Sequence, residues 1–180
     1  MKTLELGSIS HGTLRDEDLI PVFMDTLETM DAKRAKSLRW QYRKLFNYYS
    51  EERIKPYSDR EIERLNVDAS YLVNEVLYDA LNEHCPSYTY FGAHPGDGSD
   101  FGVWVSDEQI QDDIKDEFLT AVSDLAEIDD MITQTGIIPK TVILTNDHGN
   151  ETLYAVKAEL EEGDSSYKLV WETEEIWSVV

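Results

Sequence analysis

The chain has 180 residues, of which 41% are hydrophobic and 11% aromatic, so it is long enough to bury a core and too rich in large side chains for a disordered polymer. Its 37 acidic and 16 basic residues give a formal charge of -21, which repels nucleic acids and anionic membranes and favours a basic protein surface as partner. With one cysteine and no apolar run long enough for a bilayer, neither an intramolecular disulfide nor a membrane span is expected, and we predict a cytoplasmic protein.

Three helices are expected in the first half of the chain. Apolar residues recur at spacings near 3.6 over 14–30, which predicts an amphipathic helix. Over 32–49 a stripe of apolar and aromatic residues is flanked by six basic residues, which predicts a basic amphipathic helix. Ser58 and Glu61 match a capping box, and this pattern predicts that a third helix starts there and runs over 58–84.

Strand patterns dominate the rest of the chain. Aromatic and β-branched runs at 87–91 and 101–105 predict a hairpin whose two strands are joined by an elaborate turn over 92–100. An acidic helix is expected over 107–131, with Phe118 on its buried stripe. The C-terminal part is expected to hold strands at 141–145, 152–160 and 167–171, turns at 146–150 and 163–166, and a segment at 176–180 that continues the sheet or pairs with it.

This order of elements predicts the α+β class. It comprises three N-terminal helices, a β-hairpin, one acidic helix and a C-terminal antiparallel β-meander, all in one mixed-layer domain. We expect a single domain over 1–180, in which 1–86 are mainly helical and 87–180 form antiparallel sheet plus one helix.

The acidic helix is the most specific feature of the sequence. Over 107–130 ten carboxylates occupy a length of about 36 Å, or one per about 3.6 Å, close to the phosphate spacing of about 3.4 Å along one DNA strand. This density predicts a non-enzymatic DNA mimic that inhibits a basic, nucleic-acid-binding protein, although acids also simply solvate an outer helix face. The predicted partner-binding residues are Asp107, Glu108, Asp112, Asp113, Asp116, Glu117, Asp124, Glu127 and Asp130.

Two turns support an alternative interpretation, a metal-dependent, hydrolase-like enzyme. Each turn carries histidine and aspartate, which are ligands or acid–base groups in such enzymes, but the same residues are ordinary in tight turns. The candidate metal-binding residues are His94, Asp97, Asp100, Asp147 and His148. The leading interpretation assigns no catalytic residue and no cofactor.

Two further possibilities concern other surfaces. The six bases within 33–44 either pair internally with the acidic helix or form a separate contact face for an acidic or nucleic-acid partner. Exposed aromatic residues such as Trp171 and Trp177 are compatible with a subunit of a larger assembly, which is a third interpretation. The pattern does not fix an oligomeric state.

Two stretches carry a resemblance to a known group of proteins. The strings FGAHPGDGSDFGVW at 91–104 and TNDHGNETLY at 145–154 are similar to small, uncharacterised acidic proteins carried by phages and plasmids. The resemblance implies a mobile-element context, in which acidic proteins oppose host defences, and implies no activity or catalytic residue. In charge and size alone, the chain also resembles acidic DNA-mimic antirestriction proteins.

Overall fold

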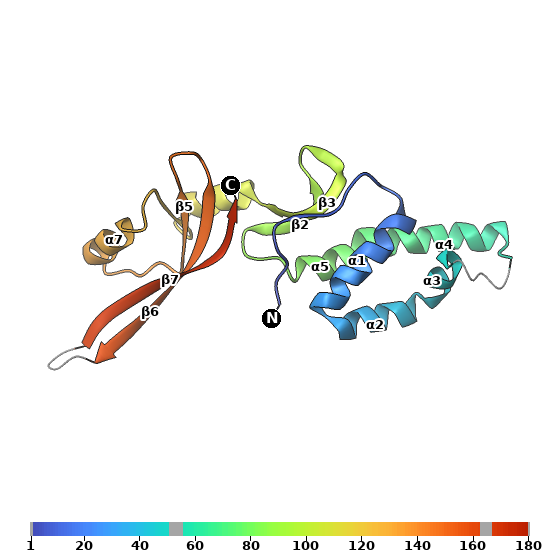
Figure 1. Cartoon of the computed structure of the whole chain (residues 1–180), viewed down its shortest axis with the longest axis horizontal. Helices are drawn as coiled ribbons and strands as arrows, with labels where there is room; N and C mark the ends of the chain where they lie inside the picture. Colours follow the sequence, from blue (N-terminus) through green and yellow to red (C-terminus); the bar gives the residue numbers. More distant parts are fainter. Residues whose placement is uncertain (1, 51–55, 163–166, 180) are drawn as a thin grey trace. The chain divides into compact units, whose positions relative to one another are not determined.

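The computed structural model describes residues 2–50, 56–162 and 167–179 (Figure 1). Helices and two sheets are both present, which confirms the α+β class. The chain divides into two compact units, Met1–Val105 and Ser106–Val180, and the hairpin belongs to the first unit with the helices. The single domain over 1–180 stays a prediction, and the expected turn at 163–166 and the end of the segment 176–180 lie outside the described residues.

The helices of the first unit follow the expected order. The predicted helix 14–30 is confirmed as α1, whereas the segment 32–49 is divided at Tyr42, whose backbone leaves the helical region. The capping box is present, with the Ser58 N–H donating to the Glu61 carboxylate at 2.9 Å. The helical elements are α1 (Asp16–Met30), α2 (Ala32–Gln41), α3 (Arg43–Tyr49), α4 (Asp59–Tyr71), the π-helical segment η1 (Leu72–Leu77) and α5 (Tyr78–Asn82).

A three-stranded antiparallel sheet completes this unit, in the order β1-β3-β2 (Figure 1). Its strands are β1 (Gly7–Ser10), which the sequence analysis missed, β2 (Thr89–His94) and β3 (Asp97–Val105). The elaborate turn expected over 92–100 is wrong, because His94 already pairs with Asp97 and only two residues form the turn. The strands extend since Gly92 and Ala93 continue the ladder opposite Gly102 and Phe101.

Aromatic rings form the centre of the first unit's core. Phe23 of α1 is fully buried and meets Phe91 of β2 edge-on, with ring centroids 4.9 Å apart. Phe101 of β3 and Tyr78 of α5 approach the same ring at 5.7 and 6.3 Å. Such edge-to-face pairs add to the free energy gained by burying apolar area, so this cluster joins the helices to the sheet.

The second unit is built on a four-stranded sheet with order β4-β5-β6-β7. Its antiparallel part confirms the predicted meander, while the short β4 adds a parallel edge strand to β5. The strand β7 is continuous where two separate segments were expected. The elements are α6 (Asp107–Lys115), β4 (Thr120–Val122), α7 (Glu127–Thr135), β5 (Thr141–Thr145), β6 (Glu151–Glu162) and β7 (Tyr167–Val179).

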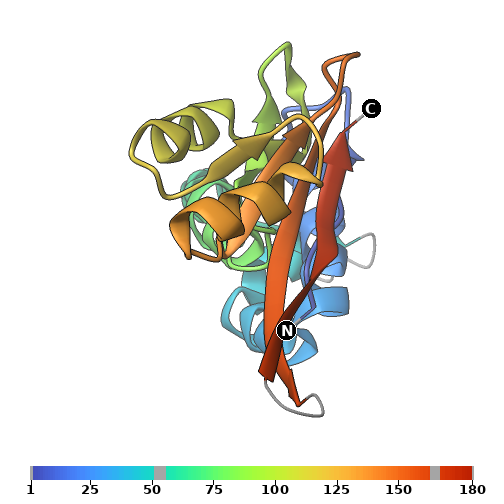
Figure 2. The ribbon, with the colours of Figure 1, turned by 90° about the vertical axis from the view of Figure 1, so that its left-hand side faces the viewer.

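Strands β6 and β7 continue beyond β5 as a long two-stranded ribbon (Figure 2). Strand β5 pairs with 151–155 only, whereas β6 and β7 stay paired as far as Glu162 and Tyr167. A two-stranded ribbon is marginal in water by itself. Part of its support comes from α7, where the Trp171 indole N–H donates to the Asp129 carboxylate at 2.7 Å.

Candidate functional site

The acidic segment is not the single helix that was expected over 107–131. Helix α6 ends at Lys115, and Glu117 follows with a positive φ of 64°. Acids at i,i+4 spacing repel one another, and carboxylates near a helix C-terminus oppose the helix dipole, so the residues that made the segment acidic also end its first helix. Each of the two helices has nine residues, or about 13.5 Å, and the continuous row of about 36 Å is therefore a wrong prediction.

The nine predicted partner-binding acids nevertheless all lie in the second unit, on α6, on α7 and between them. All are exposed except Asp113, which is half-buried. Two of these carboxylates already accept hydrogen bonds from nearby residues at the start of α7. Glu127 accepts from the Ser123 hydroxyl, and Asp124 accepts from the Ala126 N–H. The acids most open to a partner are therefore those of α6 and of the turn that follows it.

An exposed aromatic side chain stands within these acids. Phe118 is 76% exposed, although the sequence analysis placed it on a buried stripe. Its backbone N–H is held by the Asp113 carbonyl at 2.8 Å, so the turn presents the ring from a fixed backbone. We call the group Asp112, Asp116, Glu117 and Phe118 the acidic loop. A large apolar ring among carboxylates is a surface that combines charge with an anchor.

The metal-binding alternative receives no support from the described residues. His94 accepts the Gly96 N–H at 3.0 Å, and Asp100 accepts the Ser8 hydroxyl at 2.5 Å. Hydrogen bonds from the Ser99 N–H and hydroxyl hold the pKa of Asp97 below its ordinary value. His94 and Asp97 therefore serve the hairpin turn, and Asp100 links β3 to β1.

The other two candidates belong to the second unit. Asp147 and His148 lie in the β5–β6 turn with side chains 86% and 80% exposed, and the Asp147 Oδ1 and His148 Nε2 atoms are 3.7 Å apart. Within the described parts of the chain, no three His, Cys, Asp or Glu side chains are grouped so that they could hold a metal ion. The metal-dependent enzyme stays a prediction without a site.

Cys85 carries a half-buried thiol with a raised pKa rather than an activated nucleophile. Burial raises its pKa to about 11 from 9.0, although hydrogen bonds to its thiolate form oppose the shift. The folded state therefore holds the thiol proton more tightly than the unfolded state does, and the group costs stability as the pH rises from 9 toward 11.

We expect Cys85 to react with a disulfide reagent at pH 8 roughly 100-fold more slowly in the folded protein than in urea, because the thiolate fraction falls tenfold per pH unit. Following the released chromophore with and without urea measures this ratio. Equal rates in the two solutions would contradict the assignment.

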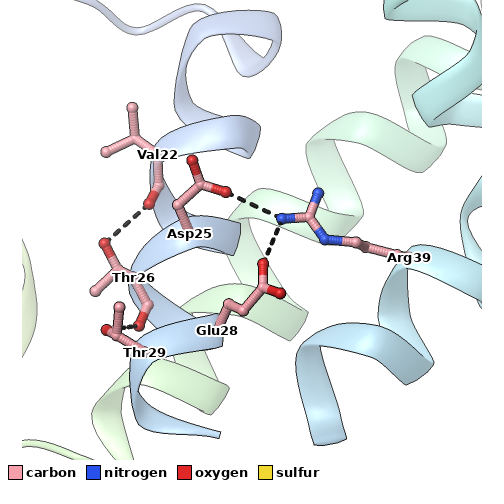
Figure 3. Close-up of polar contacts among 6 residues, drawn as sticks. All are labelled: Val22, Asp25, Thr26, Glu28, Thr29 and Arg39. Atoms are coloured by element: carbon pink, nitrogen blue, oxygen red, sulfur yellow. Dashed lines mark hydrogen bonds and ion pairs between the residues drawn. The ribbon is translucent and has the colours of Figure 1, made fainter. Parts of the chain in front are cut away.

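Among the residues that the structure describes, internal ion pairs occupy two of the six bases of α2 and α3. Arg39 donates to Asp25 and Glu28 of α1 at 3.0 and 2.9 Å, as Figure 3 shows. Arg34 donates to Glu83 at 2.6 Å. These partners belong to the first unit, so the internal pairing predicted with the acidic helix is wrong for both arginines. The second possibility, a separate contact face, remains for the other bases.

The aromatic residues proposed for a larger assembly are less exposed than expected. Trp177 is 5% exposed, and Trp171 is half-buried with its indole N–H bonded to Asp129. Neither offers the exposed ring on which that interpretation was based. Exposed aromatic side chains are found instead at Trp40, Tyr71 and Phe118.

Comparisons with known proteins gave no relative. A scan of family models, a search of curated proteins and a search of solved structures each returned no match for this chain. Among the helices that the structure describes, none has the length and apolar character that a bilayer crossing requires.

Proposed function

We propose that this chain is a non-enzymatic binding protein of the cytoplasm, which presents the acidic loop and the acids around it to a basic, nucleic-acid-binding protein. By occupying the surface that nucleic acid would use, it inhibits that protein. The resemblance of 91–104 and 145–154 to phage and plasmid proteins makes a host defence protein the natural target of such an inhibitor.

The exposed ring of Phe118 carries the proposal. If the acids served only to keep the protein soluble, carboxylates alone would be enough. A ring that is 76% exposed among them lowers solubility, and such exposed rings are typical of binding interfaces. The charge is also concentrated in this unit. Residues 106–180 hold 19 acids against four lysines, while 1–105 hold 18 acids against 12 bases. Mimicry then comes from the surface of the loop rather than from one long helix.

Capture from a host lysate, repeated with variants, tests the proposal. We expect the wild-type protein to retain a nucleic-acid-binding protein at low salt and to release it to duplex DNA or high salt. Reversing Asp112, Asp116 and Glu117 to lysine removes three exposed charge contacts and should weaken the captured complex about 10- to 100-fold. Phe118→Ala should weaken it about tenfold. Titration of the purified partner by calorimetry measures both changes.

Matched controls separate a local surface from diffuse charge. Glu63, Glu75 and Asp79 are exposed acids of the first unit, and reversing them to lysine changes the net charge by the same amount. Leu14→Ala removes an apolar side chain of similar exposure, 67%. Two results would contradict the proposal. One is an equal loss of affinity in the control and loop variants, and the other is a captured protein that duplex DNA does not displace.

A further inference from the structure

The outer side of α2 and the start of α3 form a basic surface on an acidic protein. Residues 32–50 contain six bases and no acid. Lys33, Lys36 and Trp40 follow one another at helical spacings of three and four residues, so they share one stripe of α2, opposite the buried Ala35 and Leu38. We call Lys33, Lys36, Trp40 and Arg43 the basic face.

The charges of this face are not used in ion pairs within the described part of the protein. Arg34 forms an ion pair with Glu83, and Arg39 forms ion pairs with acids of α1. No described carboxylate forms an ion pair with Lys33, Lys36 or Arg43. All three are exposed. The Lys33 and Lys36 ammonium groups are therefore available to a partner, while the Arg43 guanidinium donates to the Trp40 carbonyl at 3.3 Å.

Trp40 gives the basic face an anchor. Its ring is 72% exposed, and the Arg43 guanidinium lies 5.1 Å from the ring centroid. Stacking on the guanidinium holds the indole at the surface, and tryptophan and arginine are the residues most enriched among interface hot spots. The face thus has the same composition as the acidic loop, one aromatic ring among like charges, with the opposite sign.

We propose that the basic face binds the acidic loop of a second copy of this chain, so that Trp40 meets Phe118 and the lysines meet Asp112, Asp116 and Glu117. Every copy brings both surfaces at equal concentration. The contact joins two different surfaces, so it either closes a dimer in which it is made twice or builds head-to-tail oligomers. It uses the loop that the proposed function assigns to an outside partner, but it does not require such a partner.

Charge complementarity favours a second copy over nucleic acid. A polyanion has uniform negative charge and meets the field of a chain with net charge -21 along its whole length. Two copies also repel at long range, yet at physiological salt this repulsion is screened beyond about 8 Å, and an oriented contact then joins opposite charges. The apolar rings give the contact a part that salt does not screen.

Sedimentation equilibrium of the full chain tests the contact. At about 0.15 M salt, where the long-range repulsion is screened, we expect the average mass to rise with concentration above the chain mass of 20.7 kDa, and to fall again as the salt is raised toward about 1 M. Lys36→Gln and Trp40→Ala should each weaken association about tenfold. The controls are Lys140→Gln, an exposed lysine of the other unit, and Leu14→Ala, which should leave association unchanged.

A mixing experiment identifies the two surfaces. One variant lacks the basic face (Lys33→Gln, Lys36→Gln, Trp40→Ala) and the other lacks the acidic loop (Asp112→Asn, Asp116→Asn, Phe118→Ala). Each should be monomeric alone, and an equimolar mixture should form dimers and stop there, because only one intact pair of surfaces is left.

Three results would overturn the proposal. They are a wild-type chain that stays monomeric at about 0.15 M salt, association that survives in both triple variants, and a mixture that does not dimerise. An oligonucleotide that binds the wild type and loses affinity with Lys36→Gln would also overturn it and would place nucleic acid on the face. A monomeric chain leaves the proposed function intact, since that is measured with the outside partner.

Discussion

Phe23→Ala is expected to lower the free energy of unfolding of the first unit by about 3–5 kcal/mol, because it removes a fully buried ring and leaves a cavity. We expect the upper end of this range, because Phe91, Phe101 and Tyr78 each lose an edge-on aromatic partner. Urea denaturation followed by circular dichroism measures the change. Leu14→Ala, at an exposed site two residues before α1, should change the free energy of unfolding by less than about 0.5 kcal/mol. A loss below about 1 kcal/mol would show that this cluster does not hold the helices on the sheet.

Gly102→Ala is expected to detach strand β1 from β3. A Cβ atom at this position would lie 2.2 Å from the Gly7 carbonyl oxygen and 2.9 Å from the Ser8 Cα. Both are backbone atoms of the paired strand, so no side chain can rotate away, and the strands must separate at a cost of about 1–3 kcal/mol or more. Hydrogen exchange at Gly7–Ser10 should quicken accordingly.

Gly98→Ala is the matched control, because its Cβ would meet nothing within 4 Å on the same strand. Unchanged exchange at β1 in Gly102→Ala would contradict the register that places Gly102 opposite Ser8.

The sequence predicted what depends on local chemistry. The capping box at Ser58 and the turn residues between β5 and β6 mark their elements through hydrogen bonds made within a few residues. Strand β1 was missed since four residues carry too short a pattern, and its pairing with β3 spans more than 90 residues of sequence. The break at Tyr42 has no glycine or proline to announce it.

The candidate site was predicted in composition but not in shape. The acids of 107–130 were identified correctly, yet apolar periodicity extended one helix through the point where Asp116 and Glu117 end it. Phe118 fits a stripe at helical spacing and was assigned to the core for that reason, while the turn exposes it. A density of negative charge near a helix C-terminus was the available signal, because carboxylates there oppose the helix dipole and favour a break.

The π-helical segment η1 sets the phase of the long helical run from α4 to α5. In a regular α-helix, 16 residues at 100° each would place Leu81 about 160° away from Leu65, on nearly the opposite side. Both are buried, as are Leu72 and Leu77 between them. Each residue of the wider π-helical turn in η1 rotates the chain by less than the 100° of a regular α-helix. This smaller rotation brings the apolar side of α5 back to the core. The number of residues in η1 therefore determines whether α4 and α5 can bury their apolar sides together. Deleting one residue within η1 would turn the apolar side of one of the two helices toward water.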